Sequence, residues 1–221
     1  VIVRRGCRRQ PRTSYPGEAD AGRSRDRVSA ERRNRNMEIF DIVDENGMPT
    51  GQTVERKEAH RNGIWHRTSH VWIVRRHEGK VQILLQKRCD TKDSYPGCYD
   101  ISSAGHIPAG VDFVASALRE LKEELGLEVQ AEDLIECGTR RILLDEEFYG
   151  EPFHDRQFSK VFLLWLDKEE SGFSVQKEEI DSVRWMDFSE CKKAVAENAI
   201  PNCIDMEELL MLEPYLREDK S

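Results

Sequence analysis

Three glutamates, Glu120, Glu123 and Glu124, lie close together in one short segment and could hold a divalent cation. At about 100° per residue, the apolar residues of this segment fall on one stripe of a helix and the glutamates on the opposite side. The apolar residues are Val114, Leu118, Leu121 and Leu125. Carboxylate oxygens are the ligands that Mg²⁺ and Mn²⁺ prefer, especially beside a phosphate group. The segment alone is equally typical of an amphipathic helix with a solvated acidic face.

A glycine-containing loop precedes this helix at a specific spacing. Ala104-Gly105-His106-Ile107-Pro108-Ala109-Gly110 is followed by Arg119-Glu120-Leu121-Lys122-Glu123-Glu124-Leu125-Gly126-Leu127. The stretch resembles the signature of the Nudix family: glycine, five residues, glutamate, seven residues, then Arg-Glu-apolar-any-Glu-Glu-any-Gly-apolar. One position departs from the signature, because Val111 stands where the family has its first glutamate. The adjacent Asp112 is a candidate substitute, which would require a shift of one residue.

The resemblance implies a hydrolase of phosphoanhydride bonds that uses Mg²⁺ or Mn²⁺ as its cofactor. Glu120, Glu123 and Glu124 match the metal-binding carboxylates of the family, and the backbone carbonyl of Gly105 matches an accompanying ligand. Arg119 matches the arginine that orients these carboxylates. Since Val111 removes one partner of that arginine, we expect weaker support, with reduced activity or an altered metal geometry.

The implied reaction makes its own chemical demands. Displacement at phosphorus spreads negative charge over several oxygens, so a cation that neutralises this charge and aligns water is the main requirement. The base that activates the water is one of the three glutamates or an acid outside the motif. The outside candidates are the acidic loop Asp145-Glu146-Glu147 and the pair His154-Asp155, which could equally form a solvated turn.

Most of residues 52 to 162 also resemble one Nudix branch, the isopentenyl-diphosphate isomerases, in which three histidines and two acids hold a metal. His60, His66 and His106 fall on the histidine positions. Together with Asp155 they are candidates for a second metal site or for supporting the first. The branch binds its diphosphate through an arginine and a lysine, matched here by Arg88 and Lys92. A local cationic pair is what an acidic protein needs to hold a diphosphate.

The catalytic pair of the isomerases is absent. Ala104 stands at the position of their cysteine and Gln157 at the position of their glutamate. Neither side chain can transfer a proton, and moving a double bond needs both a general acid and a general base. We therefore predict a pyrophosphohydrolase acting on a small-molecule, nucleoside-type diphosphate, with an isomerase and a non-catalytic diphosphate-binding module as alternatives. Outside these motifs, His70 and His77 are interpreted as structural residues.

Hydrophobic patterning predicts the elements that carry these residues. We expect strands at 38–43, 70–76, 81–86, 135–144, 158–166 and 183–186, a short return strand through Gln52 and Val54, and helices at 114–125, 190–197 and 206–216. Gly126 stands where a helix C-terminal cap is expected. Strands interleaved with few helices indicate a mixed sheet covered by helices. The Nudix resemblance specifies this α/β (α+β) class further, as an α/β/α sandwich with a mixed β-sheet.

The charge divides the chain into two parts. Residues 1–36 contain eleven Arg, no Lys and four acidic residues, and they lack apolar periodicity. We expect them to be a disordered extension, derived from upstream gene sequence, with a basic arm or an organelle transit peptide as the alternatives. Residues 37–221 are expected to form a single Nudix domain that ends in a C-terminal helix.

Composition limits the partners and the location. Residues 37–221 carry a net charge of −15, which disfavours nucleic acid as a partner. No apolar run reaches the roughly 20 residues of a membrane span, and the six cysteines include no CxxC pair. We therefore expect a cytoplasmic protein with reduced thiols and no membrane partner; a homodimer is only the general expectation for soluble enzymes.

Overall fold

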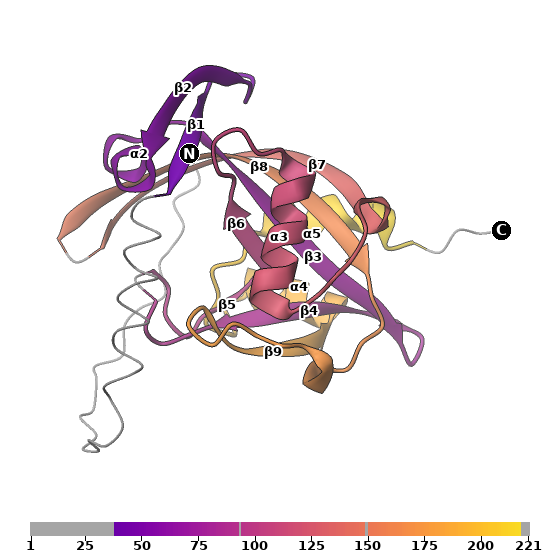
Figure 1. Cartoon of the computed structure of the whole chain (residues 1–221). Helices are drawn as coiled ribbons and strands as arrows, with labels where there is room; N and C mark the ends of the chain where they lie inside the picture. Colours follow the sequence, from indigo (N-terminus) through magenta and orange to yellow (C-terminus); the bar gives the residue numbers. More distant parts are fainter. Residues whose placement is uncertain (1–37, 93, 149, 218–221) are drawn as a thin grey trace, which may run out of the picture.

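The computed structural model describes residues 38–217 except 93 and 149, so the expectations for residues 1–36 lie outside the described residues (Figure 1). In chain order the strands and helices are β1 (Ile39–Val43), β2 (Pro49–Glu55), α2 (Arg56–Asn62), β3 (His66–His77), β4 (Lys80–Arg88), β5 (Tyr99–Asp100), β6 (Ser103–His106), α3 (Phe113–Leu125), β7 (Leu134–Phe148), β8 (Glu151–Trp165), β9 (Ile180–Asp187), α4 (Phe188–Ala196) and α5 (Met206–Leu212). Short 3-10 turns lie at Ala131–Asp133, Glu170–Gly172 and Glu213–Tyr215.

The main sheet has seven strands in the order β5-β4-β3-β8-β7, with β6 beside β3 and β9 beside β4. β3 and β8 run parallel, and the other pairs in this sheet are antiparallel. The predicted mixed sheet is therefore confirmed. One edge of β3 is shared: residues 68–71 pair with β6 and residues 74–77 with β4. The sheet splits at this point.

Both faces of the sheet are buried, which gives the predicted three layers. On β3, Val71 and Ile73 pack in a cluster with Leu121 and Leu125 of α3. The alternate residue Trp72 packs on the other face, in a cluster with α4 and α5. Figure 1 shows α3 in front of the sheet with α4 and α5 behind it. Successive side chains of a strand point to opposite faces of the sheet, and both faces are buried here. The central strands therefore have continuous apolar runs instead of an alternating pattern.

A second, two-stranded sheet of β1 and β2, together with α2, lies at one end of the main sheet (Figure 1). Phe40 of β1 is fully buried and bridges to Pro108, in the loop before α3. The backbone N–H of Ala109 donates to the carbonyl of Ile39. These contacts fix β1 against the loop that carries Gly105 and His106, and the ring of Phe40 contacts the rings of both His60 and His106.

Several local predictions differ from the structure. β7 and β8 form one long hairpin, so residues 145–147 lie in β7 and the predicted acidic loop is wrong. Part of the glycine loop forms β6. α2 and β5 were not predicted, because each is short and lacks an apolar repeat. Helix α5 ends at Leu212, where Pro214 and a 3-10 turn follow.

Two wider observations accompany these elements. In the part of the chain that the structure describes, no helix is both long and apolar enough to cross a membrane. The five cysteines in this part form no disulfide with one another.

Candidate active site

Helix α3 holds the three glutamates in a defined orientation. It begins after Asp112, whose Oδ1 accepts a hydrogen bond of 2.8 Å from the backbone N–H of Ala115. It ends at Gly126, which adopts φ +67° and donates to the carbonyls of Leu121 and Lys122. Asp112 therefore caps the helix. Its exposed carboxylate is engaged at the helix N-terminus and does not take the place of the signature glutamate, which is Val111 here.

Glu120 and Glu124 lie against the backbone of β6. A Cβ atom on Gly105 would come within 2.2 Å of Glu120 Cδ, so only glycine allows this approach. Glu124 Oε2 accepts hydrogen bonds from the Ser103 hydroxyl at 2.7 Å and from the backbone N–H of Ala104 at 3.3 Å. Glu123 is more exposed, at the rim. The glutamates thus meet the loop residue whose carbonyl is the expected further ligand.

The positive charges near Glu120 and Glu124 do not offset the burial of these carboxylates. Burial, followed by the charge of Glu124, raises the pKa of Glu120 to about 8. Burial raises the pKa of Glu124 to about 7, although its two hydrogen bonds oppose the shift. Burial and mutual repulsion disfavour the ionised forms of these carboxylates, and a bound cation would stabilise those forms. The donor set of hard oxygens therefore fits Mg²⁺ or Mn²⁺.

Arg119 bridges two of the glutamates. Its NH2 donates to Glu120 at 2.6 Å and its NH1 to Glu123 at 2.9 Å. Arg119 Nε is buried and has no hydrogen-bond partner among the described residues. Arg119 therefore orients two carboxylates without the signature glutamate, and its Nε is left unpaired.

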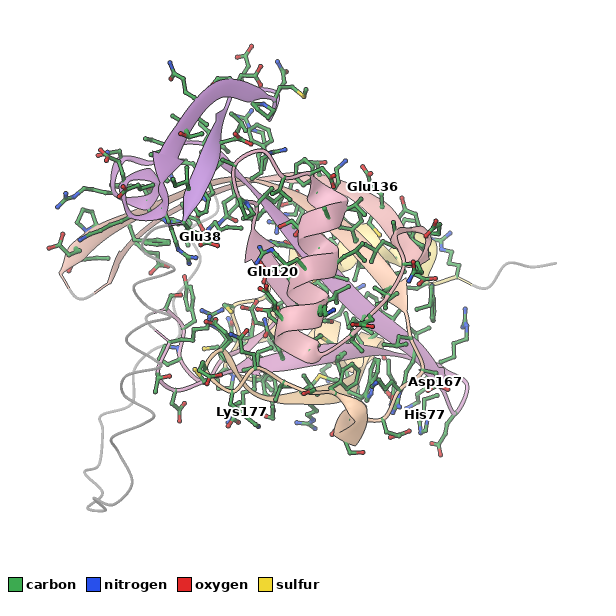
Figure 2. All side chains as sticks on the ribbon, in the orientation of Figure 1. Glu38, His77, Glu120, Glu136, Asp167 and Lys177 are labelled. Carbon is green, nitrogen blue, oxygen red and sulfur yellow. The ribbon has the colours of Figure 1, made fainter. Side chains whose placement is uncertain are left out.

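A cavity of about 970 Å³ brings most of the predicted site residues together. It is lined by Gly105, Arg119, Glu120, Glu123, Glu124, Arg88, Lys92, His60, His106 and Asp155. Figure 2 shows Glu120 projecting from α3 on the side that faces Glu38, which also lines the cavity. His66 lies behind this lining and is fully buried.

The two predicted phosphate-binding residues are held by acids. Arg88 donates to Asp100 at 2.8 Å and to the carbonyl of Ser94, and Lys92 forms an ion pair with Glu179. A third cation, Arg56, also lines the cavity and pairs with Glu38. The sequence interpretation missed Arg56; its spacing of four residues from His60 on α2 is the only signal for it.

His60, His66, His106 and Asp155 form a compact buried cluster. One ligand atom from each lies within 4.8 Å of the other three. The Nδ1 atoms of His60 and His66 donate to the carbonyls of Arg56 and Ile64, each at 2.8 Å. Their Nε2 atoms therefore point inward, 3.6 and 3.7 Å from Asp155 Oδ1.

The inward-facing atoms of this cluster lack partners. Within the described ranges, the Nε2 atoms of all three histidines and Asp155 Oδ1 are buried without a hydrogen bond. Burial lowers the pKa of His66 to about 4 and that of His106 well below its ordinary value. Neutral imidazoles whose other nitrogen is held by a backbone carbonyl are typical metal ligands. The four residues fit a metal ion.

The remaining predicted residues divide between the cavity and the surface. Ala104 and Gln157 line the cavity, whereas Asp145 pairs with His154 and Arg156 on the exposed hairpin. Glu146 accepts a hydrogen bond from the Tyr95 hydroxyl at 2.9 Å. Of the outside candidates for the base, only Asp155 lines the cavity.

His70, interpreted from sequence as structural, also lines the cavity, and it contacts buried Glu208. His77 is exposed. No sequence signal connects His70 to Glu208, which is 138 residues away.

Comparisons with known proteins agree with this architecture. A family model described as the NUDIX domain matches residues 65–204. An uncharacterized Nudix hydrolase of Clostridium acetobutylicum is 37% identical over 143 residues, which cover 65% of this chain and 66% of that protein. Nudix hydrolase 3 of Arabidopsis thaliana is 40% identical over 162 residues, covering 69% of this chain but 20% of that protein. The chain thus spans about two thirds of the first relative and a fifth of the second.

A solved structure shares the fold. The crystal structure of a Deinococcus radiodurans protein superposes with a TM-score of 0.61 at 18% identity, covering 80% of this chain and 99% of that chain.

Proposed function

The chain belongs to the Nudix hydrolase family, and we propose that it is a divalent-metal-dependent pyrophosphohydrolase acting on a small-molecule, nucleoside-type diphosphate. One observation carries the proposal. Glu120, Glu123 and Glu124 meet Gly105 in the same cavity that Arg88 and Lys92 line. A metal-binding carboxylate group and phosphate-binding cations therefore share one space of about 970 Å³.

Each residue has a defined task in this proposal. Glu120, Glu123, Glu124 and the Gly105 carbonyl would hold Mg²⁺ or Mn²⁺, which when bound neutralises charge on the phosphates. Arg119 keeps two of these carboxylates in place through its 2.6 and 2.9 Å hydrogen bonds. A glutamate of this group accepts the proton of the attacking water, since Asp155, the candidate outside the motif that lines the cavity, is assigned to the histidine cluster.

When phosphate binds, the cations must either share their acidic partners with the phosphate or exchange them for it. Arg88 and Lys92 each contact an acid, so an incoming diphosphate shares or displaces Asp100 and Glu179. Arg56, paired with Glu38, adds a third cation. A guanidinium can bind a carboxylate and a phosphate at once because it has five donors in one plane.

The cluster of His60, His66, His106 and Asp155 is proposed as a second metal site. His106 directly follows Gly105, so the two sites adjoin along β6. Three imidazoles and one carboxylate suit Zn²⁺ or Mn²⁺ better than Mg²⁺. The second site would hold the loop of Gly105 in place and add positive charge near the phosphates.

Two alternatives are less well supported. An isomerase of isopentenyl diphosphate needs a proton donor and a proton acceptor, and Ala104 and Gln157 in the cavity offer neither. A non-catalytic binding module would have no need of three carboxylates held by Arg119 and Ser103.

The decisive experiment measures metal-dependent release of phosphate or pyrophosphate from a diphosphate panel by the full chain. The panel contains nucleoside di- and triphosphates, nucleotide sugars, dinucleotides, thiamine diphosphate and isopentenyl diphosphate. Hydrolysis should fall at least a hundredfold in Glu123→Gln and Glu124→Gln, and stay unchanged in Glu128→Gln, which is exposed and lies outside the cavity lining. Formation of dimethylallyl diphosphate without hydrolysis would instead favour the isomerase.

A further inference from the structure

His70 of β3 is held by a buried carboxylate and borders the cavity. Its Nδ1 lies 2.9 Å from Glu208 Oε1. Glu208, on α5, is 1% exposed and also accepts hydrogen bonds from Trp72 Nε1 at 2.9 Å and from Arg140 NH1 at 2.6 Å. Burial alone would raise the pKa of Glu208, but His70 and Arg140 lower it to about 2. An ionised Glu208 can only accept, so His70 Nδ1 carries the proton and the ring orientation is fixed.

The other nitrogen of His70, Nε2, has no hydrogen-bond partner among the described residues. His70 lines the cavity and is not part of the metal-binding cluster. Because Glu208 holds its Nδ1, His70 is a hydrogen-bonding group in a fixed orientation at the edge of the space for the substrate.

The register of the sheet places this group next to the reaction centre. His70 pairs with Ala104 across β3 and β6, and Ala104 directly precedes Gly105. Paired side chains lie on one face of a sheet, about 5 Å apart at Cβ. His70 and Ala104 both line the cavity. A ligand whose phosphates lie beside Gly105 can therefore reach His70 with the group that it carries.

We infer that His70, positioned by Glu208, determines substrate specificity by hydrogen-bonding the group that the diphosphate carries. The substrate class is then a diphosphate ester of a hydroxyl-bearing group, a nucleoside or a sugar, and not of a hydrocarbon. A hydrocarbon group would displace water from His70 Nε2 and leave this nitrogen without a hydrogen bond. Sites that hydrogen-bond a polar group of the substrate strongly disfavour analogues that lack this group. The inference rests on the proposed function only in that it assumes a diphosphate bound in this cavity.

Binding of non-hydrolysable probes tests the inference without requiring turnover. The probes are methylenediphosphonate, its four ribonucleoside esters, its hexose ester and its isopentenyl ester, titrated calorimetrically into the full chain with Mg²⁺. The wild type should bind at least one nucleoside or hexose ester more tightly than both the plain and the isopentenyl probes. His70→Ala should weaken that ester tenfold or more and leave methylenediphosphonate within twofold.

Three further variants separate specificity from folding. His70→Gln keeps a hydrogen-bonding group and should recover part of the affinity, whereas His70→Phe fills the space and should favour the isopentenyl probe. His77→Ala, on the same strand but exposed, is the matched control and should bind every probe like the wild type. Melting temperatures of all variants check that each is folded.

Each outcome bears on the inference separately from the proposed function. Equal binding of the polar esters by wild type, His70→Ala and His70→Phe overturns it, as does a wild type that prefers the isopentenyl probe or binds no ester more tightly than methylenediphosphonate. The predicted binding pattern, together with no hydrolysis of any compound in the diphosphate panel, would support the specificity role of His70 and refute the proposed hydrolase function.

Discussion

At the scale of single residues, Arg67 of β3 and Arg119 of α3 have buried Nε atoms that lack hydrogen-bond partners in the described part of the chain. Arg67 NH2 donates to the carbonyl of Val111 at 3.0 Å and to Asp41. Val111 therefore lies beside a guanidinium group, at the position where the Nudix signature has a glutamate.

Replacing Val111 with glutamate should increase hydrolysis severalfold. The new carboxylate can pair with Arg67 or Arg119, which gives the arginine that orients Glu120 and Glu123 a second anchor. The measurement is kcat/KM with the best substrate of the panel. Val111→Gln is the control, because glutamine has the size of glutamate but no charge, and it should not gain activity. Equal rates for both variants and the wild type would show that Arg119 needs no such anchor.

Replacing His66 with alanine should abolish the second metal site. The wild type should bind one equivalent of Zn²⁺ or Co²⁺ there and gain about 2.7 kcal/mol of stability at a metal concentration a hundredfold above Kd. Removing one of four ligands should weaken this binding at least a hundredfold. Calorimetry and the absorption spectrum of bound Co²⁺ measure both effects. His154→Ala, on the exposed hairpin, should bind like the wild type; loss of binding there too would contradict the assignment.

At the scale of elements, the cap of α3 separates stability from catalysis. Asp112→Ala removes the 2.8 Å hydrogen bond to Ala115 and should lower the free energy of unfolding by about 1 kcal/mol. Asp112→Asn keeps a capping oxygen and should retain both stability and hydrolysis. Denaturant titration and the hydrolysis assay measure the two. A strong loss of activity in the asparagine variant would mean that Asp112 acts as the missing signature glutamate.

The elements also show what sequence can predict here. Helix α3 was predicted because its apolar stripe, its Gly126 cap and its glutamates are all local in sequence. The extent of β8 was underestimated because its first half, in which Phe153, Asp155 and Gln157 line the cavity, shows no apolar pattern. The contact of His70 with Glu208 could not be predicted, since it spans 138 residues and depends on how α5 packs behind the sheet.

At the scale of the whole molecule, an acidic protein places several cations around one cavity. Residues 37–221 carry a net charge of −15, yet Arg56, Arg88 and Lys92 all line the same space. Each of these cations is paired with an acid of its own. The cavity is therefore poised to exchange carboxylates for phosphates, while the acidic surface disfavours long polyanions. Exclusion of nucleic acid stays a prediction, which a binding titration at low salt would check.

The stability of the whole protein should report the glutamate cluster through its pH dependence. Glu120 and Glu124 have an ordinary pKa of 4.5 but about 8 and about 7 in the fold. Between these values the native state binds more protons than the unfolded state, so the free energy of unfolding must fall as pH rises. His66, whose pKa is lowered to about 4, acts in the opposite direction, but only between about 4 and 6.5.

Above pH 6.5 the two glutamates therefore dominate, and the metal-free protein should lose stability between pH 6.5 and 8.5. Denaturant unfolding in EDTA across this range measures the loss. Saturating Mg²⁺ should remove it, because the cation favours the ionised carboxylates. The double variant Glu120→Gln, Glu124→Gln should lack the slope even without metal, while Glu128→Gln should keep it. If the double variant and the wild type lost stability in parallel, the groups that release protons in this range would have to lie elsewhere in the fold, and the cluster would not be a site that a cation completes.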